Sequence, residues 1–313
     1  MKILPSLLAT GLLALAPLAL SAKIVRTVER SFTVQPGGNL TVVTQGGDIV
    51  VHTADTPEVR VVARQTVRAN TDAEADKLLA DQSLRIEQQG NDVIAEAKYE
   101  RSKSGLVWKS WPPVTVDFTV TVPRSYNLGL TTSGGDIGVE SLQGQVKART
   151  SGGDLNFARI DGELEARTSG GDIYLKEGTA RAKLTTSGGD IDVERAGGPT
   201  EVSTSGGNIR IEAATELVSA TTSGGNVRVS LAGPLQRDAF VSTSGGNVVV
   251  RVPAAAGFQL DARTSGGDVK AAGITLKISE GGVGKSRLAG AVNGGGPVLK
   301  LRTSGGDITL KTE

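Results

Sequence analysis

Apolar and polar residues alternate along most of the chain in short runs that flank a repeated Thr-Ser-Gly-Gly-Asp/Asn motif. Its serine occurs at Ser133, Ser151, Ser169, Ser187, Ser205, Ser223, Ser244, Ser265 and Ser304. The first six of these serines lie 18 residues apart, and the later spacings are 21, 21 and 39 residues, where 39 equals one spacing of each kind. A fixed period of this size indicates a repeat architecture.

Within a repeat, the residues three and five before the serine and four and six after it are mostly apolar. In the repeat of Ser169 they are Ala166, Leu164, Ile173 and Leu175, and the residues between them are mostly polar or charged. This period-two alternation predicts two short strands per repeat, each with one buried face. We expect the two glycines between the strands to supply the backbone freedom that a sharp corner needs.

A strand of this length cannot bury its apolar face alone, but repeats stacked about 4.8 Å apart bury it as continuous ladders. We therefore predict an all-β fold: a parallel β-helix, or single-stranded β-solenoid, right-handed, with coils of about 18 residues. A β-propeller blade needs about 40 residues. An antiparallel meander needs tight two-residue turns at both ends of its strands. The pattern disfavours both alternatives.

Residues 1–22 are predicted to be a secretory signal peptide. Lys2 precedes a mostly apolar run, and small residues lead to a cleavage site after Ala22 or Ser21. An uncleaved anchor is disfavoured because Pro5, Gly11 and Pro17 suit a membrane-spanning helix poorly. We expect an exported protein, periplasmic or at the cell surface, with no membrane span after signal removal.

Residues 23–127 are expected to form an N-terminal cap with irregular first coils, and residues 128–313 the regular solenoid. The stretch 40–51 resembles a repeat with Gln45 in the serine position. Residues 71–81 predict the one helix, with Thr71 as N-cap and Glu74 three positions on. Residues 83–86 and 93–99 predict a hairpin. Such a cap would cover the unpaired strands that a solenoid leaves at its end.

At the other end, the repeat missing between Ser265 and Ser304 is assigned to residues 276–283, and 294–296 are expected to form a mobile glycine loop. The repeat 299–311 is expected to be the last coil of the stack, with strand edges blunted by charged side chains. Unpaired edges can pair with another strand. We therefore predict weak self-association, or docking of a partner, through this C-terminal coil edge.

Composition limits the function classes. Lys plus Arg is 34 and Asp plus Glu is 33, and a net charge of +1 gives no support for nucleic-acid binding. There is no cysteine, and His52 is the single histidine. We predict no catalytic residues and no cofactor. The alternative is a β-helix polysaccharide lyase or hydrolase, but such enzymes use long loops with aromatic platforms, and aromatic residues are only 3% of this chain.

An acidic or amide side chain follows the double glycine in every repeat. These residues are Asp136, Asp154, Asp172, Asp190, Asn208, Asn226, Asn247, Asp268 and Asp307. One interpretation is a calcium-binding β-roll, but calcium takes six to eight oxygen ligands, and three consecutive coils carry asparagine. We instead predict a structural corner ladder, in which these side chains accept hydrogen bonds from backbone amides of the turns, without metal.

Two further features have a structural and a functional interpretation. The threonine before each motif serine could belong to an ice-binding face, but its parity with the buried positions predicts that it points inward. Trp108 and Trp111 lie in a Lys/Ser/Pro-rich segment, 101–113. They are a candidate docking point for a partner or membrane surface, or a plug for the open end of the solenoid.

The repeat Leu-x-x-x-Thr-Ser-Gly-Gly-Asp-Ile-x-Val, preceded by Val122-Pro123, resembles bacterial exported proteins of unknown function known as putative adhesins, relatives of the head-GIN-domain autotransporter adhesins. The resemblance spans residues 23–313. It implies a β-solenoid in the cell envelope, with adhesion or a link to envelope-stress signalling as the associated roles, and it supplies no catalytic residues. We predict a non-enzymatic binding or scaffold solenoid whose partner, protein or glycan, the sequence does not identify.

Overall fold

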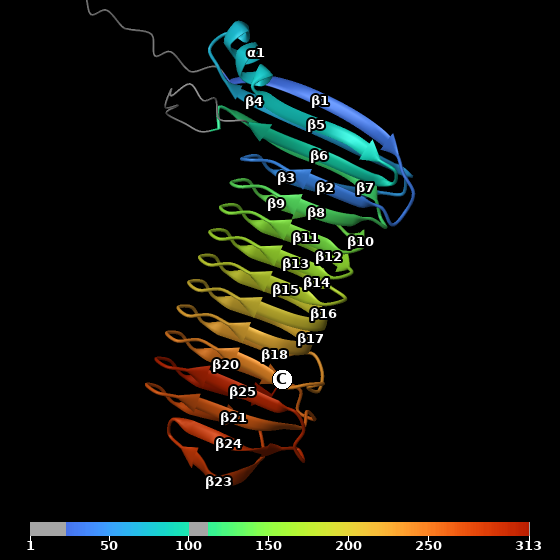
Figure 1. The fold of residues 1–313 in the computed structure, drawn as a ribbon. Helices are drawn as coiled ribbons and strands as arrows, with labels where there is room; N and C mark the ends of the chain where they lie inside the picture. Colours follow the sequence, from blue (N-terminus) through green and yellow to red (C-terminus); the bar gives the residue numbers. More distant parts are fainter. Residues whose placement is uncertain (1–22, 100–111, 313) are drawn as a thin grey trace, which may run out of the picture.

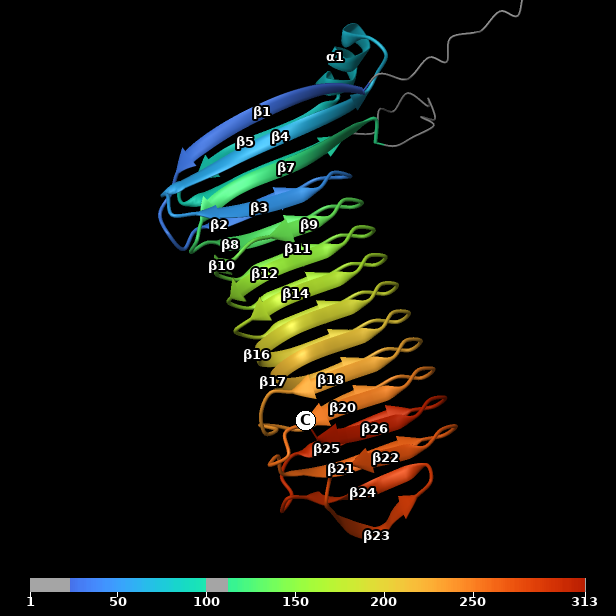
Figure 2. The same ribbon diagram turned by 180° about the vertical axis from the view of Figure 1, so that it is seen from behind.

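The chain folds into an elongated stack of strands with its one described helix at the N-terminal end (Figure 1). The computed structural model describes residues 23–99 and 112–312. The predicted signal peptide and the two tryptophans lie outside these residues. Two layers of strands face each other along the stack, and Figure 2 shows the layer that lies behind in Figure 1.

Layer one is the sheet that contains the strand after each corner. In spatial order it consists of β1 (Lys23–Thr33), β4 (Glu58–Arg68), β7 (Val114–Pro123), β3 (Ile49–Ala54), β9 (Ile137–Val139), β12 (Leu155–Asp161), β14 (Ile173–Gly178), the first halves of β16 (Ile191–Ser203) and β17 (Ile209–Thr221), β18 (Val227–Leu231), β20 (Val248–Val252), β26 (Ile308–Thr312) and β22 (Val269–Ala272). A two-residue strand, β10 (Leu142–Gln143), pairs with the end of β12.

Layer two contains the strand before each corner. In spatial order it consists of β5 (Gln82–Gln89), β6 (Asp92–Tyr99), β2 (Asn39–Val43), β8 (Asn127–Thr131), β11 (Val146–Arg149), β13 (Leu164–Arg167), β15 (Ala182–Thr185), the second halves of β16 and β17, β19 (Ala239–Ser242), β25 (Val298–Thr303), β21 (Phe258–Thr264), β24 (Arg287–Val292) and β23 (Leu276–Gly284). Because β16 and β17 run through both layers, hydrogen bonds join all these strands into one sheet.

Successive repeats stack in parallel and in register. Val146 lies opposite Leu164, and Leu164 lies opposite Ala182, so each coil advances by one 18-residue repeat. Equivalent pairings join β12 to β14 and β14 to β16 in the other layer. The predicted all-β, solenoid-like fold is thereby confirmed. It arises because every repeat offers the same backbone edge and the same apolar face to the next.

The core lies between the two layers and consists of the predicted inward positions. Ile173 and Leu175 are 1% and 0% exposed, and their equivalents in neighbouring coils are also buried. Val218, five residues before Ser223 and so a predicted inward position, is only half-buried, because a register shift between β16 and β17 places Leu217 opposite Thr200. A second register shift, between Thr200 and Glu201, restores the original pairing and leaves Val218 without a partner in β16. Val269 and Ala271 on β22, near the end of the stack, are also only half-buried.

The N-terminal end is built as a cap. β1, β4 and β7 pair antiparallel in layer one, and β5 and β6 form the predicted hairpin in layer two. α1 (Asp72–Ala80) connects the two layers and buries Ala75 and Leu78. Its N-cap is Thr71, whose hydroxyl accepts a hydrogen bond from the Glu74 amide at 3.2 Å, while the Glu74 carboxylate accepts from the Asn70 amide. The pattern resembles a capping box, but the Glu74 carboxylate accepts from the residue before the N-cap rather than from the N-cap itself.

The C-terminal end differs from the sequence prediction. The coil of β25 and β26 does not end the stack but lies between two earlier coils: β25 pairs with β19 and β21, and β26 pairs with β20 and β22. Figures 1 and 2 show it as a red coil between orange ones. The prediction of an unpaired strand edge at this coil is therefore wrong, because both edges of the coil are hydrogen-bonded to other coils.

The sequence-based assignment of the repeat between Ser265 and Ser304 is also wrong. Residues 276–283 belong to β23, which pairs antiparallel with β24 rather than forming a parallel coil. β24 in turn pairs antiparallel with β21, so a hairpin closes this end of layer two. The exposed large apolar residues Ile278 and Val283 lie on β23. The stretch keeps the double glycine of the motif but lacks the threonine and acid whose hydrogen bonds join the other corners.

Candidate functional site

The corners of the coils line up along one edge of the molecule (Figure 1), and their acidic or amide residues are joined by hydrogen bonds. The Oδ1 atom of Asp154 accepts from the backbone N–H of Asp172 at 2.7 Å, and Asp172 accepts from Asp190 at the same distance. The series continues through Asp136, Asp154, Asp172, Asp190, Asn208, Asn226, Asn247, Asp307 and Asp268. Each of these side chains except that of Asp268, which ends the series, thus accepts a hydrogen bond from an amide of the adjacent coil.

The ladder has two further members, Asp48 and Asp117, that the sequence analysis did not include. Asp48 accepts from the Asp136 amide at 2.9 Å, and Asp117 accepts from the Asp48 amide at 3.2 Å. The segment Thr44-Gln45-Gly46-Gly47-Asp48 carried the signal for the first, since it matches the motif in all but the serine. Asp117 has no motif around it, so only the stacking of β7 on β3 reveals it.

The motif threonines point inward. Thr168 is 1% exposed, and its hydroxyl donates to the carbonyl oxygen of Gly153 in the adjacent coil at 2.9 Å. Thr150 and Thr186 make the same contact with Gly135 and Gly171. A buried hydroxyl needs such a partner. These side chains are therefore unavailable to an ice surface.

The second glycine of each corner is required for close approach rather than for backbone freedom. A Cβ atom placed on Gly171 would lie 2.1 Å from the carbonyl oxygen of Gly153 in the next coil. None of the double glycines in the described corners has φ in the left-handed region. The expectation of special backbone freedom is thus corrected: the coils meet backbone to backbone at this point.

That the corner residues bind no metal ion remains a prediction. Across residues 23–99 and 112–312, no three His, Cys, Asp or Glu side chains are grouped so that they could hold a metal ion.

We expect thermal melts in excess EDTA and in millimolar calcium to agree within error, because the Oδ1 atoms already accept backbone hydrogen bonds. A rise of many degrees with calcium would contradict the hydrogen-bonded ladder.

The outer surface of layer two carries a shallow groove over β11, β13 and β15. Its volume is about 260 Å³, and its charged lining residues are Lys147, Glu163, Glu165, Arg181 and Lys183. These side chains occupy the outward positions of consecutive coils, so strand alternation and stacking place them in rows. The sequence analysis named no binding residue here, because alternating charges on an exposed strand face are ordinary in isolation.

Ion pairs hold part of this surface in place. Arg149 donates to Glu165 at 2.8 Å, and this hydrogen bond, with further attraction from nearby cations, holds the pKa of Glu165 below its usual value. Arg181 and Lys183 both form ion pairs with Glu201, with nitrogen–oxygen distances of 2.8 and 3.8 Å. Lys147 makes no ion pair with any residue that the structure describes. Cations therefore outnumber carboxylates on this surface.

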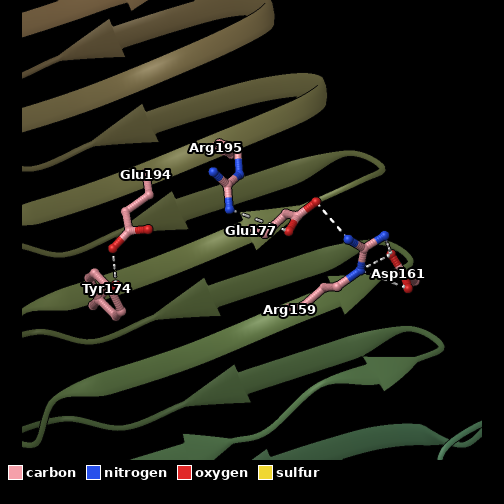
Figure 3. Close-up of polar contacts among 6 residues, drawn as sticks. All are labelled: Arg159, Asp161, Tyr174, Glu177, Glu194 and Arg195. Atoms are coloured by element: carbon pink, nitrogen blue, oxygen red, sulfur yellow. Dashed lines mark hydrogen bonds and ion pairs between the residues drawn. The ribbon is translucent and has the colours of Figure 1, made fainter.

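The opposite surface, on layer one, carries a more acidic arrangement (Figure 3). Arg159 lies between Asp161 and Glu177, with nitrogen–oxygen distances of 3.0 and 2.7 Å, and its hydrogen bond to Asp161 is the main cause of its raised pKa. Arg195 approaches Glu177 at 3.8 Å. These contacts leave few free cations on this side of the same coils.

Further acidic groups adjoin that arrangement. The Tyr174 hydroxyl is hydrogen-bonded to Glu194, which raises the tyrosine pKa. Asp192 is opposite Tyr174 in the next coil. Burial raises the pKa of Asp192; neighbouring carboxylates raise it further, whereas Arg210 lowers it. The middle coils therefore have a basic side on layer two and an acidic side on layer one.

His52 pairs with Glu140 at 2.9 Å on the surface of β3, and the hydrogen bond lowers the pKa of Glu140. Trp108 and Trp111, the candidate docking residues, lie outside the described residues. Among the described helices, none has the length and apolar character that crossing a bilayer requires.

The fold and corner motif define an all-β, solenoid-like protein, and comparison with known families agrees. The chain belongs to the Toastrack DUF4097 family, whose model matches residues 38–311. A search of curated proteins finds no significant match.

Several solved structures resemble the chain at low identity. A putative adhesin from Parabacteroides merdae is 10% identical, with 92% of this chain and 96% of that chain covered and a TM-score of 0.45. A putative lipid binding protein from Parabacteroides distasonis is 14% identical, with 91% and 96% covered and a TM-score of 0.45. A putative adhesin from Bacteroides fragilis is 14% identical, with 92% and 97% covered and a TM-score of 0.38.

Proposed function

We propose that this protein is a non-enzymatic, exported solenoid of the cell envelope that acts as an adhesin-like binding surface. The observation that carries the proposal is the groove over β11, β13 and β15, where Lys147, Glu165 and Lys183 form one row of outward side chains and Arg181 lies beside this row. Stacked coils hold such rows at fixed spacing, which suits a linear ligand that repeats along its length.

The ligand class that fits this groove is an acidic polysaccharide. Neutral sugars are bound largely by stacking on aromatic rings, and aromatic residues are only 3% of the chain. Carboxylate or sulfate groups instead need cations, and Lys147 has no ion pair among the described residues to give up on binding. The contacts would be exposed, so binding should weaken as salt screens the charges.

A charge-reversal experiment tests this proposal. We expect the triple variant Lys147→Glu, Arg181→Glu, Lys183→Glu to bind dextran sulfate or polygalacturonate about tenfold more weakly or worse, because each exposed contact contributes roughly 0.2–1 kcal/mol and reversal adds repulsion. Isothermal titration calorimetry at two salt concentrations measures the effect.

The matched control reverses three cations of the opposite layer, Lys176, Arg195 and Arg210, which changes the net charge by the same amount. This control should retain most of the affinity. Equal losses in both variants would mean that only net charge matters and would overturn the groove as the binding site. Reproducible cleavage of a polysaccharide would favour the lyase or hydrolase alternative instead.

The finer features of the proposal rest on the sequence. Export rests on the predicted signal peptide of residues 1–22, and the relation to head-GIN-domain adhesins and to envelope-stress signalling rests on the repeat motif. We further propose that the stack is a right-handed parallel β-helix of one repeat per coil. The 18-residue register between neighbouring parallel strands from β8 to β15 and from β9 to β14 supports the parallel, single-stranded part of this description.

A further inference from the structure

The coil formed by β25 and β26, here called the inserted coil (Val298–Thr312), fills a slot that earlier parts of the chain define. One wall of the slot is the coil of β19 and β20, and the other is the coil of β21 and β22. The chain leaves room for one coil when it passes from the first wall to the second. It then forms the hairpin of β23 and β24 and returns to fill the slot.

The inserted coil is bonded to both walls along its length. Its buried residues Leu299, Leu301, Ile308 and Leu310 are at most 1% exposed. On one wall, the Thr303 hydroxyl donates to the Gly246 carbonyl oxygen at 2.8 Å. On the other, Arg302 donates to the Asp261 carbonyl oxygen at 2.6 Å and also pairs with its carboxylate. Without this coil, two strand edges and the core between them would be exposed.

The segment that leads into the inserted coil has the features of a hinge. Asn293, Gly294, Gly295 and Gly296 all have positive φ, of 44°, 88°, 87° and 149°. The Asn293 amide anchors the start of this segment to the carbonyl oxygens of Ala254 and Ala256, at 2.8 and 3.0 Å. Glycines make alternative paths of the chain accessible at little steric cost. The coil beyond the anchor can therefore leave in more than one direction.

The contacts between the slot and the inserted coil depend on the repeat pattern of the coil, not on the segment that connects it to β24. Val298–Thr303 pairs with β19 and β21 through backbone hydrogen bonds, and the ladder residue Asp307 is joined to Asn247 and Asp268 as in any other corner. An identical coil supplied by another molecule would make every one of these contacts. Only the hinge and the entropy of association distinguish the two arrangements, which is the condition for exchange of an identical element between copies.

We propose that the inserted coil is exchangeable between copies: Val298–Thr312 of one molecule fills the slot of a second molecule, and reciprocal exchange gives a dimer. The partner of this surface is thus a second copy of the chain. The mode differs from the edge pairing expected from the sequence, because no free strand edge of the coil takes part.

Disulfide trapping tests the exchange in the full mature chain, which has no cysteine of its own. Phe240 and Lys300 are opposite each other on β19 and β25, and the Lys300 Nζ lies 5.7 Å from the centre of the Phe240 ring, so both side chains share the outer face. A Phe240→Cys chain and a Lys300→Cys chain are mixed, incubated at high concentration below the melting temperature, and oxidised. Peptide mapping counts only the disulfide between the two different positions.

The control pair is Lys147→Cys mixed with Glu165→Cys, which are opposite each other on β11 and β13 in the middle of the stack. Middle coils cannot be exchanged without unfolding. We expect the Phe240/Lys300 pair to give at least about ten times the mixed disulfide of this control. A single chain carrying both Phe240→Cys and Lys300→Cys should close the bond internally, which verifies the geometry.

A second variant removes Gly294 and Gly295 and so shortens the link between β24 and β25, residues 293–297, from five residues to three. A shorter hinge disfavours return of the coil into its own slot, so sedimentation velocity should show a shift from monomer toward dimer. Mixed disulfide at the control level in both the natural and the shortened hinge would overturn the proposal. Monomeric sedimentation of the shortened, folded chain would count against it equally.

Discussion

Replacement of Gly171 by alanine is expected to destabilise the protein by about 3 kcal/mol or more. The added Cβ would lie 2.1 Å from the Gly153 carbonyl oxygen and 2.5 Å from its carbonyl carbon. These are backbone atoms, and no side chain can rotate away to relieve the overlap. The two coils would have to separate locally, which would stretch the hydrogen bonds from Thr168 to Gly153 and from Asp172 to Asp154.

The adjacent glycine provides a matched control. A Cβ on Gly170 would meet its nearest neighbour, the Gly152 carbonyl oxygen, at 3.5 Å, which is an ordinary van der Waals contact. Gly170→Ala should therefore change the free energy of unfolding by less than about 0.5 kcal/mol. Urea unfolding followed by circular dichroism compares the two variants. Equal losses would show that close approach is not the reason for the second glycine.

Ile173→Ala is expected to cost about 2–5 kcal/mol, because the side chain is 1% exposed and its removal leaves a cavity between the layers. Ile173 is opposite Leu155 and Ile191 in the parallel ladder, so both neighbouring coils lose a contact. A solenoid is stabilised mainly by such contacts between neighbouring repeats.

Lys147→Ala serves as the comparison, since its side chain is exposed on β11. It should lower the free energy of unfolding by less than about 0.5 kcal/mol. Denaturant midpoints and slopes of both variants give the two free energies. Comparable losses would mean that the inner and outer positions of the strands have been assigned to the wrong faces.

The strand pattern was predictable because it is local and repeated. Alternation on either side of the double glycine assigns residues such as Leu175 to the core, and the N-cap Thr71 with Glu74 three residues on assigns the start of α1. The inward direction of Thr168 follows from the same parity. The register shift that buries Leu217 instead of Val218 did not follow, because a one-residue bulge leaves the surrounding pattern intact.

The candidate groove was less predictable than the corner ladder. The ladder is made of one residue type at one position of every repeat, so its spacing is visible in the chain. The groove combines Lys147, Arg181 and Lys183, which are separated by up to two repeats and by carboxylates of the intervening coil. Their proximity depends on stacking, and their availability depends on which neighbours form ion pairs.

The sequence by itself determined the unit of this protein: two strands, a corner closed by Thr-Ser-Gly-Gly-Asp/Asn, and an apolar face that only another repeat can cover. These properties depend on periodicity and on the chemistry of a few residues. The tertiary structure alone decided the order of the units, because every coil offers nearly the same edge and apolar face. A nonconsecutive coil, Val298–Thr312, can therefore occupy the place between β20 and β22 that sequence order would not assign to it.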